Sequence, residues 1–377
     1  MALFPLLIAT FFQALLKKKF SYKIHKIDFS VFLFFIFIFI NLIVSSIRGT
    51  LFSQFIFVLY VVVPLFIYLY IRLINYDISS FTRLIYRFTL LYALYVIAEF
   101  LLYYFFPELK GVITHYLQYI VKTNNFYPPT VKYPIIGVAS KPWGPMFDTS
   151  ATGAFLVVLF AFIFDSRKYI KKDSLNILIF LAITAIFLSG SKSAYMMFLI
   201  YIVLRTTLFK QAKATKLYLF FLTLIFFTVI LAIVSFINFF FTDELLNWYI
   251  YAMVTEPVSK LISGFYQNGI FTLIGSGQEN GYYKIFGMGE IDFFNAIFRY
   301  GLFSMMTFLS LIVYLIVKYK RKYAQFSIMF IMFIMSMVHY QVILKFPASM
   351  ILFISIGVLA NEEIKKNRYD CNKGQVV

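Results

Sequence analysis

The chain has 377 residues, of which 62% are hydrophobic and only 13% are charged, and its mean hydropathy is +0.85. A soluble domain has about 45–50% apolar and about 25% charged residues, so this composition excludes an ordinary soluble globular domain. The formal net charge is +18, but the basic residues lie mostly between long apolar runs. That placement favours anionic lipid headgroups over nucleic acid as the partner of the positive charge.

The apolar runs predict an all-α polytopic membrane protein with about 11 transmembrane helices, since one span needs about 20 residues. In chain order the runs are residues 2–16, 29–47, 52–73, 84–106, 149–165, 174–190, 193–209, 216–241, 291–317, 324–343 and 346–361. The first run precedes its lysines, whereas a secretory signal has its charges first, so we expect a retained span. Residues 1–377 are predicted to form a single transmembrane domain.

The basic connections predict the topology of these spans. If the spans alternate in direction, the four strongly basic connections fall on the same side. They are 17–26, 167–172, 205–216 and 318–322. The positive-inside rule makes that side and the C-terminus cytoplasmic. The opposite, outer side then carries two long loops, at about 107–148 and 242–290, which we expect to be ordered and functional.

Two lysines on the predicted outer side stand out. Lys141 lies among proline and glycine residues just before the helix predicted from residue 149, whose cap can come from Asp148, Thr149 or Ser150. There it can bind a phosphate beside free backbone N–H groups, or be a simple interfacial lysine. Lys192 follows Ser189-Gly190-Ser191 at a helix start, where both the positive-inside bias and the helix dipole disfavour a cation. The serines and the glycine are expected to be structural.

Three further groups can carry chemistry. Glu290 and Asp292 open the predicted span 291–317, where helix capping is the alternative explanation. Arg299 lies seven residues after Asp292, on the same helical face and about 10 Å deeper, and needs an anionic partner. His339 ends the tenth span, and Glu99 is an acid inside the fourth span whose partner the sequence does not name.

The order of these segments resembles a known family. The segment around Lys141, the Ser-Gly-Ser-Lys turn, the large second loop and the stretch from Glu290 to Gly301 follow one another as in Wzy-type O-antigen and capsular polysaccharide polymerases. O-antigen ligases are more distantly similar. Lys141 and Lys192 stand where these proteins often have arginine. Lysine keeps the positive charge but lacks the bidentate guanidinium fork. Asp292 stands where ligases typically have histidine, which favours a polymerase.

The resemblance implies a C-type glycosyltransferase architecture in the bacterial cytoplasmic membrane, with an active site that faces the periplasm or exterior. It implies an undecaprenyl-pyrophosphate-linked oligosaccharide as donor and a lipid-linked repeat unit as acceptor. A flippase and a chain-length regulator are the expected protein partners, and nucleic acid is not. The product is O-antigen, capsule or exopolysaccharide.

The expected reaction inverts the anomeric carbon without a metal or other cofactor. Lys141, Lys192 and Arg299 are the candidate pyrophosphate-binding cations, because fixed cations stabilise the leaving group's developing charge. Asp292 or Glu290 is the candidate base, with His339 as second choice. Trp143 and Tyr282 are candidates for stacking on sugar rings, although interfacial anchoring is their alternative explanation. An O-antigen ligase-type transferase and a lipid-linked oligosaccharide flippase remain alternatives.

Overall fold

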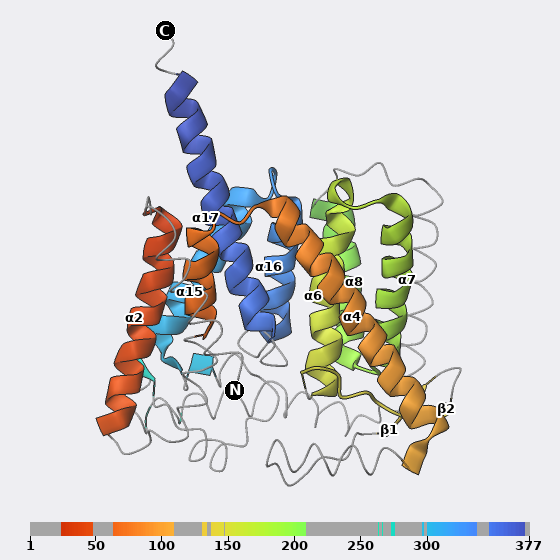
Figure 1. Cartoon of the computed structure of the whole chain (residues 1–377). Coiled ribbons are helices and arrows are strands. Elements are labelled where there is room, and N and C mark those ends of the chain that lie inside the picture. The colour runs from red at the N-terminus through yellow and green to blue at the C-terminus, as the bar shows by residue number, and fades with distance from the viewer. Residues whose placement is uncertain are drawn as a thin grey trace.

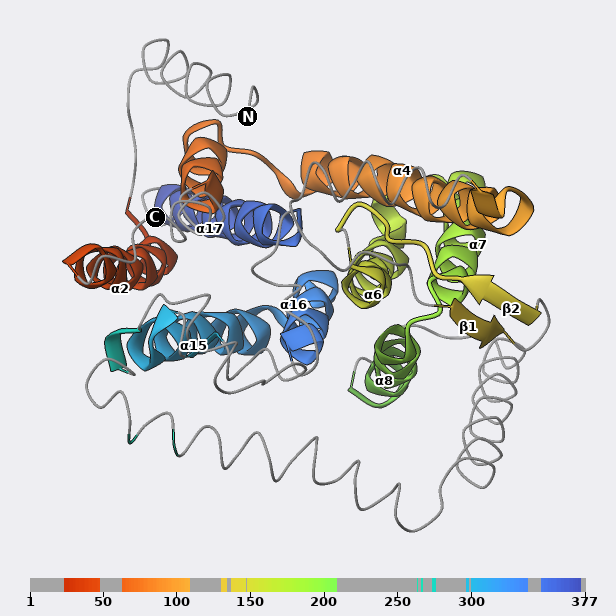
Figure 2. The same cartoon turned by 90° about the horizontal axis from the view of Figure 1, so that it is seen from below.

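The computed structural model describes residues 24–47, 63–108, 130–133, 137–146, 148–208, 273–275, 296–297, 300–337 and 347–373, with isolated residues 263 and 266. These residues form helices and one short hairpin (Figures 1 and 2). The elements are α2 (Lys26–Ile47), the helix Val63–Leu73, α4 (Ile78–Phe105), β1 (Thr130–Tyr133), β2 (Gly137–Ser140), α6 (Thr149–Asp165), η1 (Arg167–Tyr169), α7 (Lys172–Leu188), α8 (Lys192–Leu208), α15 (Leu302–Tyr319), α16 (Ala324–Met337) and α17 (Ala348–Lys373).

Several helices are long and apolar enough to span a membrane, namely Lys26–Val44, Ile78–Phe105 and Leu302–Tyr319. Their outward faces carry large apolar side chains, such as Ile43, Leu91 and Val317, which are 61%, 67% and 60% exposed. Contiguous apolar surface of this kind is unfavourable in water and matches the hydrocarbon of a bilayer. Composition and exposed side chains together identify a membrane protein. The predicted spans 2–16 and 216–241 lie outside the described residues.

Helix α6 lies at the centre of one half of the bundle. It packs against α4, α7, α8 and α16, and almost all of its side chains are buried (Figure 2). A helix that is apolar on every side belongs in a protein interior, and between Thr149 and Asp165 the sequence has no charged residue. The bounds of α6 coincide with the predicted run 149–165. In the other half, α15 packs against α2 and α16.

An antiparallel hairpin lies within the first predicted outer loop. Strands β1 and β2 pair Thr130 with Ser140 and Tyr133 with Gly137. The sequence predicted an ordered segment here but no strands, because each strand has only four residues. The hairpin lies beside the end of α7 and the start of α8 (Figure 2). We call this end of the bundle the hairpin end.

The opposite end, here called the basic end, gathers the described basic connections. Arg205, near the end of α8, forms a 2.7 Å ion pair with Asp165 at the end of α6. Lys318, near the end of α15, forms a 3.1 Å ion pair with Glu363 of α17. The C-terminal half of α17 extends beyond the other helices at this end (Figure 1). For the described connections, the predicted gathering on one side is therefore confirmed.

The predicted continuous span 291–317 is wrong at Gly301. Gly301 has a φ angle of +88° and precedes α15, while its N–H donates to the Ile297 carbonyl at 2.8 Å, as in a helical turn that ends. A residue in this conformation interrupts a right-handed helix. The helix therefore restarts at Leu302. Helix α17 also differs from its prediction, since it continues well past residue 361 to Lys373.

Candidate functional site

The structure describes some of the predicted site residues and not others. Lys141, Lys192 and Trp143 are described, all at the hairpin end. The other predicted site residues lie outside the described residues, and their roles remain predictions. They are Asp292, Glu290, His339, Arg299 and Tyr282.

The turn between α7 and α8 is built by its small residues. Gly190 has a φ angle of +59°, which L side chains rarely adopt. The Ser189 hydroxyl donates to the Ile186 carbonyl at 2.7 Å, and the Ser191 Oγ accepts from the Ala194 N–H at 3.2 Å. Ser191 is thus the N-terminal cap of α8. The expectation that these residues are structural is confirmed.

This turn packs directly onto the start of α6. A Cβ atom on Gly153 would lie 2.6 Å from the Ser189 Oγ and 2.8 Å from the Ser191 Cβ. The Ser191 hydroxyl also donates to the Ser150 carbonyl at 3.4 Å. Close approach of the two backbones therefore depends on small residues on both sides. As a result, the N-terminal ends of α6 and α8 lie side by side.

Lys141 lies against this turn, immediately after β2. Its Cγ atom is 3.2 Å from the position of a Cβ atom on Gly190, and the Tyr133 hydroxyl is 2.8 Å from that position. Tyr133 donates its hydroxyl proton to the Leu188 carbonyl at 2.8 Å, which ties β1 to the end of α7. Two loops that are distant in sequence are therefore brought together by the fold.

Lys141 and Lys192 also interact electrostatically. Burial lowers the pKa of the Lys141 ammonium, the positive charge of Lys192 lowers it further, and Asp148 opposes both effects. Desolvation and a neighbouring like charge both disfavour the charged form of an amine. We call Lys141, Lys192 and the turn 189–191 the two-lysine site. The structure thus places Lys141 against the turn that leads into Lys192, and the binding roles of the two lysines stay a prediction.

Asp148 caps α6 beside the two-lysine site. Its Oδ1 accepts from the Ser150 and Ala151 N–H groups, each at 3.0 Å. Among the three capping residues that the sequence left open, Asp148 is therefore the cap. Its carboxylate complements the positive end of the α6 dipole.

Glu99 of α4 finds its partners in the segment that follows Lys141. Its Oε1 accepts from the Trp143 N–H at 2.9 Å and from the Tyr103 hydroxyl at 2.8 Å, and its Oε2 accepts from the Gly144 N–H at 2.8 Å. Thr152 of α6 donates to the Trp143 carbonyl at 2.7 Å. The segment is thus fastened to α4 and to α6. Trp143 is positioned here by its backbone, and its stacking on a sugar ring stays a prediction.

A second contact at the hairpin end joins α2, the segment at Ile274 and the start of α15. Asn41 of α2 donates to the Ile274 carbonyl at 2.9 Å. Gly275 and Gly301 lie back to back, because a Cβ atom on Gly301 would overlap the Ile274 carbonyl group. Ile274 and Gly275 therefore contact the start of α15. This contact was not predicted, because its partners are far apart in the sequence.

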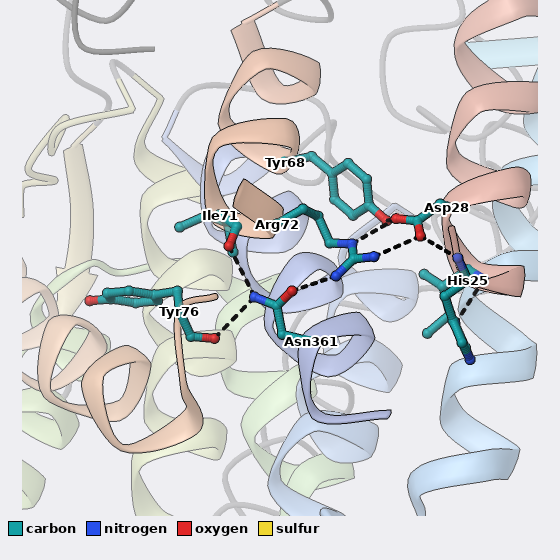
Figure 3. A network of polar contacts seen from close by, with 8 residues as sticks. His25, Asp28, Tyr68, Ile71, Arg72, Tyr76 and Asn361 are labelled. Atoms are coloured by element: carbon teal, nitrogen blue, oxygen red, sulfur yellow. Dashed lines mark hydrogen bonds and ion pairs between the residues drawn. The ribbon is translucent and has the colours of Figure 1, made fainter. Parts of the chain in front are cut away.

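A polar network at the basic end was also missed. Arg72 donates to the Asp28 carboxylate through Nε at 2.7 Å and Nη2 at 2.8 Å, and through Nη1 to the Asn361 side chain (Figure 3). Tyr68 also donates to Asp28, and Asn361 donates to the Ile71 carbonyl at 2.9 Å. Asp28 and Arg72 are almost fully buried. Because these buried groups hydrogen-bond one another, the network stabilises the packing of α2, the helix Val63–Leu73 and α17.

Within the described residues, no three or more His, Cys, Asp or Glu side chains gather as a metal site would require. Comparisons of the chain with protein-family models, with curated proteins and with solved structures found no match.

Proposed function

We propose that this chain is a polysaccharide polymerase that joins undecaprenyl-pyrophosphate-linked repeat units on the outer face of the bacterial cytoplasmic membrane. The observation that carries the proposal is the two-lysine site, where Lys141 and Lys192 meet at the hairpin end. That end is opposite the basic connections, which the positive-inside rule assigns to the cytoplasm. Two cations on the outer side run against the charge bias that sets the topology. Binding of an anionic substrate explains their position.

The chemistry of the donor explains the need for two cations. Attack by an acceptor hydroxyl at the anomeric carbon breaks the bond to the pyrophosphate, and the bonding electrons leave with the phosphate oxygen. Lys141 and Lys192 would stabilise the negative charge that develops there. Exclusion of water strengthens this effect at Lys141, which is half-buried, whereas Lys192 is exposed. The configuration at the anomeric carbon inverts, and the fixed cations take the place of a metal ion.

The remaining roles of the proposal rest on the sequence. Asp292 or Glu290 accepts the proton of the acceptor hydroxyl, with His339 as the second candidate base. Arg299 is a third cation for the pyrophosphate, and Trp143 and Tyr282 stack on the sugar rings. The architecture is that of a C-type glycosyltransferase with about 11 spans.

Glycan ladders from cells that carry single variants test this function. Lys192→Ala and Lys141→Ala should leave products of one repeat unit, because each removes a cation from the leaving group. Lys365→Ala is the matched control, since its side chain is 47% exposed at the basic end and should leave the ladder unchanged. Wild-type chain lengths in both site variants would reject the proposal. Transfer of glycan without chain growth in the wild type would indicate a ligase instead.

A further inference from the structure

We propose that Glu99 is a positioning residue that holds Lys141 at the two-lysine site, an inference that rests on the proposed function. Glu99 lies on α4, whereas Lys141 lies in the loop after β2, so the carboxylate acts through the backbone that follows the lysine. The Lys141 side chain contacts Gly190, in the turn before α8.

The geometry of the carboxylate supports this role. Glu99 is only 6% exposed, and its two oxygens accept from the consecutive N–H groups of Trp143 and Gly144. The hydroxyl of Tyr103, one turn along α4, adds a third hydrogen bond to Oε1. Charge-assisted bonds from two successive N–H groups fix both the position and the orientation of a peptide segment. That segment begins two residues after Lys141.

Neighbouring contacts complete the placement of the loop. On the side of α6, Thr152 donates to the Trp143 carbonyl at 2.7 Å. On the side of β2, Ala139 pairs with Val131 in the hairpin, which Tyr133 ties to α7. Lys141 therefore lies between two anchored stretches of backbone. Of these anchors, Glu99 supplies a buried carboxylate, and a carboxylate inside a membrane helix is costly and therefore indicates a function.

A carboxylate is required because both oxygens accept. Glutamine has the same shape, but it offers one acceptor oxygen and presents an NH2 group to the second backbone N–H. One of the two N–H groups would lose its partner, and the segment would shift. A misplacement of about 1 Å at a reacting group can cost about a hundredfold in rate. Tyr103→Phe is the matched control, because it removes one hydrogen bond and keeps both backbone contacts.

The first measurement reports the position of Lys141 and does not depend on the reaction. Purified protein is treated with formaldehyde and cyanoborohydride, and mass spectrometry follows the rate at which the Lys141 amine is methylated. In Glu99→Gln, Lys141 should be methylated several-fold more slowly at neutral pH than in the wild type, because the amine gains solvent, its pKa rises, and a smaller fraction is the free amine that reacts with formaldehyde. Tyr103→Phe should match the wild type. A wild-type rate in Glu99→Gln would overturn the positioning role.

The second measurement is kcat/KM for chain growth from a purified lipid-linked repeat unit, normalised to the concentration of folded protein. Glu99→Gln should lower kcat/KM about tenfold to a hundredfold. In a double-mutant cycle, adding Glu99→Gln to Lys141→Ala should cause no further loss, because Glu99 acts through Lys141. If the losses in kcat/KM of Glu99→Gln and Lys141→Ala multiply in the double variant, the inference is overturned. Wild-type kcat/KM in Glu99→Gln would overturn it too, because a merely structural residue changes only the folded fraction.

A fold defect in Glu99→Gln is addressed by Glu99→Asp. Aspartate keeps the charge and both oxygens but is one methylene shorter, so its methylation rate and kcat/KM should lie between those of Glu99→Gln and the wild type. Wild-type values for both would contradict the role. If the wild type itself fails to extend chains, the polymerase proposal fails, while the methylation rates still decide whether Glu99 sets the position of Lys141.

Discussion

The side chain of Lys141 packs against Gly190, with its Cγ atom 3.2 Å from the place where a Cβ atom on Gly190 would lie. Gly190 also has a φ angle of +59°. The two residues belong to separate loops, so this contact is where the loop before α6 meets the turn before α8. Any side chain at residue 190 would disturb it.

Gly190→Ala should therefore lower both stability and activity. The φ angle alone costs about 1–3 kcal/mol for a residue with a Cβ atom, and the new methyl group would lie 2.8 Å from the Tyr133 hydroxyl. Thermal unfolding in detergent and glycan ladders measure the two effects. Met196→Ala is the control, because that side chain is 51% exposed on α8 and its loss leaves the turn unchanged. A Gly190→Ala protein with wild-type ladders would show that Lys141 tolerates displacement.

The lowered pKa of Lys141 predicts an alkaline limit on activity. Its cause is burial first and then the charge of Lys192, with Asp148 acting in the opposite direction. Lys141 is a cation below its pKa, so kcat/KM should fall as the pH rises through that value, below the ordinary lysine value of 10.5. Lys141→Arg should remove this limb, because a guanidinium stays charged. An identical pH profile for Lys141→Arg would assign the limb to another group.

The Asp28–Arg72 pair predicts a large stability effect at the basic end. Arg72→Met leaves the buried Asp28 carboxylate without its main partner, which costs about 3–5 kcal/mol. Thermal unfolding in detergent should show a clear decrease in Tm. Lys365→Ala breaks the pair with Glu362 on the surface and should cost about 1 kcal/mol or less. Equal Tm values for the two variants would contradict the buried network.

The contact between Ile274 and Gly301 predicts a second stability effect, at the hairpin end. Gly301→Ala adds a Cβ atom that overlaps the Ile274 carbonyl, at a φ angle of +88°. The expected loss is about 1–3 kcal/mol, measured by thermal unfolding. Met306→Ala is the control, because that side chain is 57% exposed on α15 and should change Tm little. An unchanged Tm for Gly301→Ala would argue against the back-to-back glycines.

Local properties of the sequence predicted the helical part of the fold. In the bilayer, backbone groups must hydrogen-bond within their own segment, so apolar runs form helices. The run 149–165 therefore predicted α6 with its observed bounds, and the run 29–47 predicted most of α2. The Asp148 cap was predicted in the same way, because a cap and its N–H partners lie within three residues. The break at Gly301 was missed, because apolar residues continue on both sides of it.

Which side chains meet across the bundle was decided by the tertiary structure. The sequence by itself determined that the chain enters a membrane, that its basic connections share one end, and that Lys141 and Lys192 lie at the other. It did not determine that Glu99 holds the Gly144 N–H, 45 residues away, or that Arg72 contacts Asn361, 289 residues away. Such pairs leave no periodic pattern, because the cost of burying a polar group is repaid only when packed helices bring its partner within hydrogen-bond distance.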